Sequence, residues 1–519
     1  MANHEHAHGS PSQARTGAHC CCPEPDDGIT RRGFLDGATL GSMALSWLTW
    51  SELSAAADPL PTPPKRRPLV VKTVLTYWLP QRQKQTSWRS WGGIQTQADV
   101  DQELARIRAE LDKLRGQADF PVEFLPTTAI DKTQQWKTLA DAAGADVLLI
   151  YAAGGGQELL NAANELGKPI VFFLREKSGP LSFYYEAISP WYFRHNTDQL
   201  ATKAADYNDV VVDVLDELTW RLRALCGLKN TRGTRIVAIG RAGGWAKPKA
   251  PELAKERFRM EIQVVPYPEL GKLIKAARQD EPAVALARSR AEAYLKLPGT
   301  TLQTDRKFVD NAFLLEQIFR QLMRKADCRA ITIGACMSTI MPLAETSACL
   351  TLSTLNDDGY LAFCESDFVV IPSGILLANI SGRPVFLNDP TYPHHHVVTI
   401  AHCTGPRKMD GKNLEPARIM THFESDYGAA PKVEMRKGQM TTNILPSFAA
   451  DRWVGVLGEI VDAPLLDICR DQIDIRFRCD AHQLALRMPG FHWMTCYGDY
   501  TKELGYALKH VGIQWECLG

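Results

Sequence analysis

Five acidic and imidazole side chains in the C-terminal half of the sequence end short apolar runs or, in the case of His492, lie within one. They are Glu365, Asp367, Asp389, His402 and His492. The apolar runs predict buried strands, and strand ends place side chains at the rim of a sheet, where sites commonly form. Two carboxylates with one or two imidazoles can hold Mn²⁺ or a similar divalent ion and leave positions for a substrate. An ion at the rim would also compensate the desolvation of these carboxylates.

Other polar groups in this region are weaker candidates. Asp389 precedes Pro390, so it is also interpretable as a simple turn residue. The run His394–His396 would split its side chains between two faces if it lies on a strand. His422 and His482 are predicted to be surface groups or groups that support a ligand from behind. Oxygen-rich ligands argue against a structural zinc site among the five candidates.

The cysteines form no C-x-x-C pair, which argues against a zinc ribbon or a thioredoxin motif. Three of the thirteen, Cys20–Cys22, lie in the N-terminal segment. The other ten mostly lie within apolar runs, where thiols behave as small hydrophobic groups. Export of the chain would permit disulfides.

The N-terminal segment has the order of a twin-arginine signal peptide. Arg31-Arg32 precedes a moderately apolar stretch over 37–51, which is too short to span a bilayer, and Ala55 and Ala57 have the spacing of a cleavage site. We therefore expect residues 1–57 to be removed. The mature protein would then be periplasmic or otherwise extracytoplasmic, without a stable membrane anchor.

The remaining chain predicts three domains after a proline-rich linker at 58–67. Strands alternate with helices over 68–200 and again over 201–380, which predicts two Rossmann-like parallel α/β domains. Short strands with few helices over 381–519 predict a β-rich, barrel-like domain. The glycine stretches in YAAGGGQELL and GRAGGW lack the G-x-G-x-x-G pattern and are predicted to be ordinary turns.

Composition limits the partners of the protein. The chain has 59 basic and 59 acidic residues and 45% hydrophobic residues, as in a soluble globular protein. This balance gives no reason to expect nucleic acid or an anionic membrane as a partner.

Two segments around the candidate carboxylates, CLTLSTLNDDGYLAFCESD and GRPVFLNDPT, resemble the L-fucose isomerase family and, more loosely, L-arabinose isomerase. The separation of 24 residues between Glu365 and Asp389 matches the family spacing. LALRMPGFHWMTCYGD is similar to the late histidine segment of the family, and TSWRSWGGIQTQADVDQELARI is similar to its N-terminal part. The resemblance covers roughly 68–519.

The resemblance implies a role for each of the main candidates. Glu365 and Asp389 would both be metal ligands and form the acid/base pair, His492 would be the imidazole ligand, and His402 would be a further ligand or substrate contact. Family members bind Mn²⁺, have two α/β domains before a β-rich domain, and commonly form hexamers. Trp88 or Trp91 would reach the substrate of a neighbouring subunit, or would only pack.

We therefore expect a metal-dependent aldose–ketose isomerase that acts on a sugar through an enediol. Two alternatives stay open: an exported, non-catalytic sugar-binding protein, and a different metal-dependent sugar reaction such as epimerisation or hydrolysis.

Overall fold

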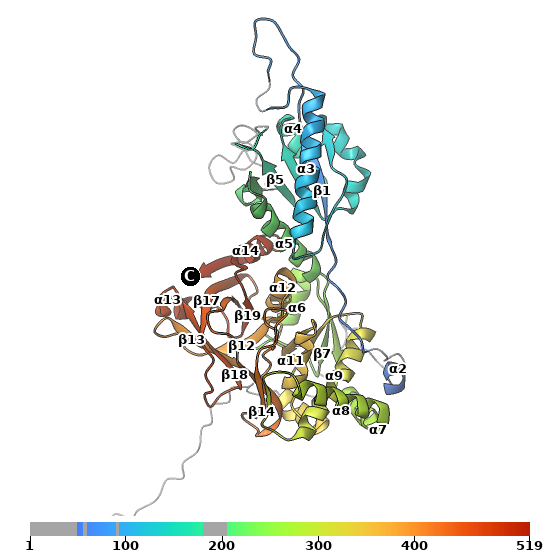
Figure 1. Ribbon diagram of the computed structural model, residues 1–519, viewed down its shortest axis with the longest axis vertical. Helices are drawn as coiled ribbons and strands as arrows, with labels where there is room; N and C mark the ends of the chain where they lie inside the picture. Colours follow the sequence, from blue (N-terminus) through green and yellow to red (C-terminus); the bar gives the residue numbers. More distant parts are fainter. Residues whose placement is uncertain (1–48, 55–59, 90–92, 180–204, 519) are drawn as a thin grey trace, which may run out of the picture. The chain divides into compact units, whose positions relative to one another are not determined.

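The computed structural model describes residues 49–54, 60–89, 93–179 and 205–518 (Figure 1). The twin-arginine pair, Trp91 and the alanines of the predicted cleavage site lie outside these ranges. Across the described residues, no helix combines the length and the apolar character needed to cross a membrane.

The first sheet is parallel and has the order β2-β1-β4-β5-β6, with β3 paired to β1. Its strands are β1 (Leu69–Thr76), β2 (Val122–Phe124), β3 (Thr128–Ile130), β4 (Val147–Ala152), β5 (Ile170–Leu174) and β6 (Val210–Val212). Every residue of β4 and β5 is buried, as expected when both faces of a parallel sheet are covered. Its helical segments are α3 (Gln97–Gln117), η1 (Thr133–Thr138), η2 (Ala140–Gly144), α4 (Gly156–Asn164) and η3 (Tyr207–Asp209), and α5 (Leu215–Thr231) follows β6.

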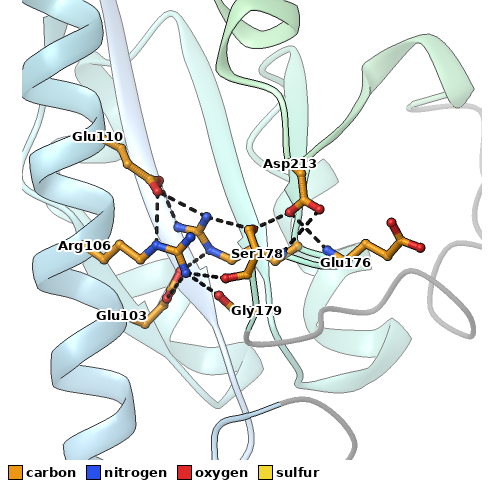
Figure 2. Close-up of polar contacts among 8 residues, drawn as sticks. Glu103, Arg106, Glu110, Glu176, Ser178, Gly179 and Asp213 are labelled. Carbon is orange, nitrogen blue, oxygen red and sulfur yellow. Dashed lines mark hydrogen bonds and ion pairs between the residues drawn. The ribbon is translucent and has the colours of Figure 1, made fainter.

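A buried ion network fastens α3 to the carboxyl end of β5. Arg175 Nε donates to Glu103 Oε1 at 2.5 Å, and its Nη2 donates to Glu110 Oε2 at 2.9 Å. Figure 2 shows Glu103, Arg106 and Glu110 of α3 facing the segment that carries Ser178 and Gly179. The guanidinium groups of Arg106 and Arg175 each have a carboxylate partner, so this network is a structural connection between the helix and the strand.

The second sheet is also parallel, with the order β11-β10-β7-β8. Its strands are β7 (Arg235–Ile239), β8 (Glu261–Val265), β10 (Ala330–Ile333) and β11 (Leu361–Cys364). The accompanying helical segments are α6 (Ala250–Phe258), α7 (Tyr267–Gln279), α8 (Glu281–Leu295), α9 (Arg306–Lys325), η4 (Cys336–Ile340), α10 (Met341–Ala344), α11 (Cys349–Asp357) and α12 (Ile371–Ser381).

The C-terminal part is a closed barrel of six antiparallel strands. Its strands are β12 (Phe386–Pro390), β13 (Val397–His402), β16 (Met440–Pro446), β17 (Arg452–Asp462), β18 (Asp471–Phe477) and β19 (Trp493–Tyr497). The order is β16-β19-β12-β13-β18-β17, and β17 pairs with β16 to close the ring. The predicted fold class, two parallel α/β parts before a β-rich barrel, is therefore confirmed.

Further elements surround the barrel. Strand β20 (Gln514–Leu518) adds to β17 in parallel, after α14 (Thr501–Lys509). Helix α13 (Ala481–Arg487) lies between β18 and β19 in the chain. The hairpin of β14 (Ala417–His422) and β15 (Tyr427–Val433) extends to β9 (Thr300–Leu302), which pairs with β14 in parallel.

The described part of the predicted leader and linker is docked on the second α/β part. Helix α2 (Trp50–Ser54) buries Trp50 and Leu53, and Trp50 Nε1 donates to Asp280 Oδ2 at 2.7 Å. In the proline-rich linker, the Pro61 carbonyl accepts from Tyr360 Oη at 2.7 Å. This segment is therefore held by specific hydrogen bonds.

Candidate metal and acid/base site

A strained turn at the end of β11 presents the first carboxylates. Glu365 and Ser366 have φ angles of +68° and +53°, in the left-handed region that non-glycine residues seldom occupy. The Ser366 hydroxyl donates to the Arg241 carbonyl at 2.7 Å, which holds the turn. Such backbone strain persists only where surrounding contacts hold the residues in place, and strained residues cluster at functional sites.

The glycine-rich segment after β7 supports Asp367. Asp367 Oδ1 accepts from the backbone N–H of Trp245 at 3.1 Å and of Val369 at 3.0 Å. A Cβ at Gly244 would lie 2.5 Å from the Ala250 Cβ, so this close turn requires glycine. The GRAGGW segment is thus more than the ordinary turn expected from the sequence, because it orients an acidic side chain of the site.

Three neighbouring barrel strands bring the other candidates together. Asp389 in β12 is paired with Ala401 in β13, so it lies beside His402, the last residue of β13. His492 directly precedes β19, which pairs with the other side of β12. The expectation that His492 lies within a strand is therefore wrong by one residue, while the predicted strand end at His402 is correct.

The His492 imidazole is the centre of the cluster. Its Nδ1 is 2.6 Å from Asp367 Oδ2, and its Nε2 is 3.1 Å from Glu365 Oε2 and 3.2 Å from Asp389 Oδ1. On the other side of Glu365, His402 Nε2 lies 3.6 Å from Oε1, which is an ion-pair distance too long for a hydrogen bond. All five side chains are less than a tenth exposed.

Burial and charge move the pKa values of these groups in opposite directions. Burial raises the pKa of Asp389 to about 6, despite the two nearby imidazoles. Burial also disfavours the ionised form of Glu365, but its contacts with His402 and His492 hold its pKa well below the usual range. For His402, burial favours the neutral ring, yet Glu365 and Asp389 raise its pKa to about 10.

Three buried polar atoms of the cluster form no hydrogen bond. They are Asp389 Oδ1, which is 3.2 Å from His492 Nε2, and the two ring nitrogens of His402, of which Nε2 is 3.6 Å from Glu365 Oε1. A neutral imidazole has one N–H, so His492 can satisfy Asp367 and Glu365 together only as an imidazolium. A divalent ion could take the place of that second proton, and Glu365, Asp389 and His492, with His402, are the residues that would hold it. Carboxylates with imidazoles suit Mn²⁺ and similar ions.

Other predicted residues are placed elsewhere or stay untested. His394, His395 and His396 are exposed in a turn before β13 rather than alternating along a strand, and His395 and His396 have positive φ. Trp88 lies in the chain segment that connects β1 to α3 and is half-buried, with the Arg89 guanidinium 5.3 Å from the centre of its ring. A contact from a neighbouring subunit remains a prediction, because one chain is described.

An aromatic stack beside the cluster was not anticipated from the sequence. The Trp245 ring lies 4.5 Å from Phe491 and 6.0 Å from Phe448, and Phe491 lies 4.8 Å from the His492 ring. Trp245, Phe448 and Phe491 are partly exposed. The only sequence signal was the position of Trp245 and Phe491 beside a glycine turn and a candidate histidine.

Comparisons with known proteins add no identification. No protein-family model matches the chain, and no curated protein matches it. A solved structure of an ABC transporter periplasmic solute-binding protein from Actinobacillus succinogenes 130z with bound D-allose is similar at a TM-score of 0.14 and 11% identity. The match covers 61% of this chain and 92% of that chain, and at this TM-score it carries no argument about fold or function.

Proposed function

We propose that this protein is a metal-dependent aldose–ketose isomerase that acts on a sugar through an enediol. The observation that carries the proposal is the contact of one imidazole nitrogen, His492 Nε2, with two buried carboxylates, at 3.1 Å for Glu365 and 3.2 Å for Asp389. The L-fucose isomerase resemblance of the segments around these residues supports the same reaction class.

Aldose–ketose isomerisation moves a proton between C1 and C2 of the sugar. A positioned carboxylate can take the proton from one carbon and return it to the other, and such general base catalysis contributes typically 10²–10⁴-fold. Glu365 and Asp389 are proposed for this role because both are buried and both face the same imidazole. Their surroundings differ, since Glu365 contacts two imidazoles while burial dominates around Asp389.

Glu365, Asp389 and His492 would hold a divalent ion such as Mn²⁺, with His402 as a further ligand or substrate contact. When bound, the ion supplies a Lewis acid that stabilises negative charge developing on the sugar oxygens. Asp367 would keep the His492 ring oriented through its Nδ1, which leaves Nε2 directed toward Glu365 and Asp389. The partly exposed Trp245 and Phe491 would offer an apolar surface to the C–H face of a sugar.

Replacement of the acid/base pair tests the proposal. With Mn²⁺ present, the wild type should interconvert an aldose and its ketose in a sugar panel followed by NMR. Glu365→Gln and Asp389→Asn keep size but remove the proton-accepting charge, so each should lower turnover by about a hundredfold or more. Glu415→Gln is the matched control, because the Glu415 and Glu365 side chains are both 8% exposed.

Metal content must be measured for each variant, because both carboxylates are proposed as ligands. A variant that retains its ion but loses turnover supports the acid/base role, and deuterium exchange at C2 in heavy water follows the proton directly. Sugars that bind without isomerisation or exchange would overturn the proposal in favour of a non-catalytic sugar-binding protein. An interconversion of epimers in place of aldose and ketose would identify an epimerase.

A further inference from the structure

A second group of potential metal ligands includes Cys403, the residue directly after His402. Cys349, Cys403 and His422 are buried, and one ligand atom from each lies within 4.8 Å of the others. Cys469 is not part of that group of three, but it packs with Cys349 and Cys403 in one small buried cluster. These four side chains form what we call the thiol cluster, and all four are at most 5% exposed.

Four separate elements contribute one residue each to the thiol cluster. Cys349 is the first residue of α11, Cys403 follows the last residue of β13, and His422 is the last residue of β14. Cys469 lies in the loop that leads into β18. Because the cysteines are more than fifty residues apart in sequence, no C-x-x-C motif marks the cluster. His422 is 2% exposed, so of its two predicted placements the surface position is wrong and a supporting position near the ligands stays open.

Neighbouring groups orient two members of the cluster. Ser425 Oγ lies 3.5 Å from His422 Nδ1, so that His422 has a neighbour on this ring nitrogen. Arg470, directly after Cys469, donates from Nε to the Thr421 carbonyl at 2.9 Å and so holds the Cys469 loop against the end of β14. Metal-binding histidines usually have such a partner on the second ring nitrogen.

Three thiols and one imidazole are the donor set of a closed, tetrahedral zinc site. A single buried thiol behaves as a small hydrophobic group and needs no other thiol or imidazole beside it. The thiol cluster also differs from the carboxylate site in ligand chemistry, since sulfur favours a soft or borderline ion while carboxylates favour Mn²⁺.

We propose that Cys349, Cys403, Cys469 and His422 bind one structural Zn²⁺ ion, separate from the ion held by the carboxylate site. On binding, the thiols lose their protons to solvent, so the affinity rises with pH. The ion joins α11, the barrel strands β13 and β18, and the β14–β15 hairpin at one point. It also fixes Cys403, the residue after His402, and thereby the end of β13 in the carboxylate site. This inference does not depend on the proposed isomerase activity.

The test uses the full chain, which is purified with reductant and stripped of metal. It is then loaded with Zn²⁺ in the presence of excess Mn²⁺. Elemental analysis should show one Zn²⁺ per chain that excess Mn²⁺ does not displace, since thiolates favour zinc whereas manganese favours carboxylate oxygens. Alkylation mapped by mass spectrometry should show Zn²⁺-dependent protection of Cys349, Cys403 and Cys469. Co²⁺ in place of Zn²⁺ should give thiolate-to-metal charge-transfer absorption.

Variants assign the ion to the thiol cluster. Cys403→Ser and His422→Gln should each weaken Zn²⁺ binding at least tenfold. Cys328→Ser is the control and should leave Zn²⁺ binding unchanged, because Cys328 is also buried, at 5% exposed, but lies outside the thiol cluster in the second α/β part. Zn²⁺ that is lost in Glu365→Gln but kept in Cys403→Ser would overturn the proposal. The same conclusion would follow if wild-type protein retained no Zn²⁺, or if protein purified without reductant contained a disulfide between Cys349 and Cys403.

Discussion

His492 is hydrogen-bonded to a carboxylate, Asp367, that is not itself a proposed metal ligand. Asp367 accepts from His492 Nδ1 at 2.6 Å and is itself held by two backbone N–H groups. Asp367 is therefore a positioning residue, because its contact with the proposed site is through the imidazole. Its effect should appear in metal affinity as well as in turnover.

Asp367→Asn should weaken Mn²⁺ binding by about 10–100-fold, the usual loss when the partner of a metal-binding histidine is changed. The amide is a weaker acceptor and leaves the imidazole poorly oriented. A calorimetric Mn²⁺ titration measures the effect. Asp474→Asn is the control, because it makes the same change of acceptor in a side-chain hydrogen bond from Thr399 outside the cluster. Equal Mn²⁺ affinity in Asp367→Asn and wild type would exclude the positioning role.

At the scale of elements, the ion pairs of helix α3 differ widely in burial, and only the buried pair links the helix to β5 among those compared. Arg175 is 3% exposed and Glu103 is 5% exposed, whereas the pair of Arg115 and Asp112 on the same helix is more than half exposed. Breaking a buried pair leaves an uncompensated charge, while exposed pairs contribute little. The attachment of α3 to β5 therefore depends on Arg175.

Arg175→Met should lower the free energy of unfolding of the first α/β part by about 3–5 kcal/mol, since Glu103 stays buried without its partner. Arg115→Met is the control and should cost at most about 1 kcal/mol. Urea denaturation followed by tryptophan fluorescence and circular dichroism measures both. Adding Glu103→Gln to Arg175→Met should recover part of the loss. Equal effects of the two arginine variants would contradict the assignment.

At the scale of the whole molecule, stability should depend on pH through His510, which ends α14. Its Nε2 is buried without a hydrogen-bond partner, and its carbonyl accepts from Arg232 at 2.7 Å. Burial lowers the pKa of His510 to about 4, against the opposing charge of Asp209. The unfolded chain protonates this imidazole near its usual pKa of about 6.5.

The folded state therefore binds fewer protons at His510 than the unfolded state between these values. This contribution to stability is fully present above pH 6.5 and is lost as pH falls to 4, by roughly 3 kcal/mol in total. His510→Gln should remove that part of the pH dependence. Chemical denaturation of wild type and variant at a series of pH values measures it. Parallel stability curves for the two proteins would refute the prediction.

Export also concerns the whole chain and remains a prediction. Arg31→Lys with Arg32→Lys should retain the protein in the cytoplasm, because the paired arginines are what the twin-arginine route recognises. Cell fractionation with an antibody measures the distribution, and N-terminal sequencing of exported protein should give a start near Asp58. Unchanged export of the double variant would exclude this route. A start before Trp50 would leave helix α2 on the mature protein.

Sequence patterns predicted the features that residues close together in the chain determine, namely the type of each element and the chemistry of single side chains. Apolar runs alternating with helical segments predicted two parallel α/β parts and a β-rich barrel, because burial of strands in a covered sheet requires continuous apolar residues. Strand-end positions also selected Glu365, Asp389 and His402, and a predicted strand contained His492, since the chemistry of a carboxylate or an imidazole is visible in one residue.

Only the tertiary structure decided which distant side chains meet. The bond of His492 to Asp367 joins residues 125 apart in sequence, and the GRAGGW turn reaches Asp367 across 122 residues. The thiol cluster draws on four elements, so each cysteine alone has the sequence context of a buried apolar residue. Local sequence reports the periodicity and polarity of its own segment, whereas such contacts depend on strand order and barrel closure, which no single segment encodes.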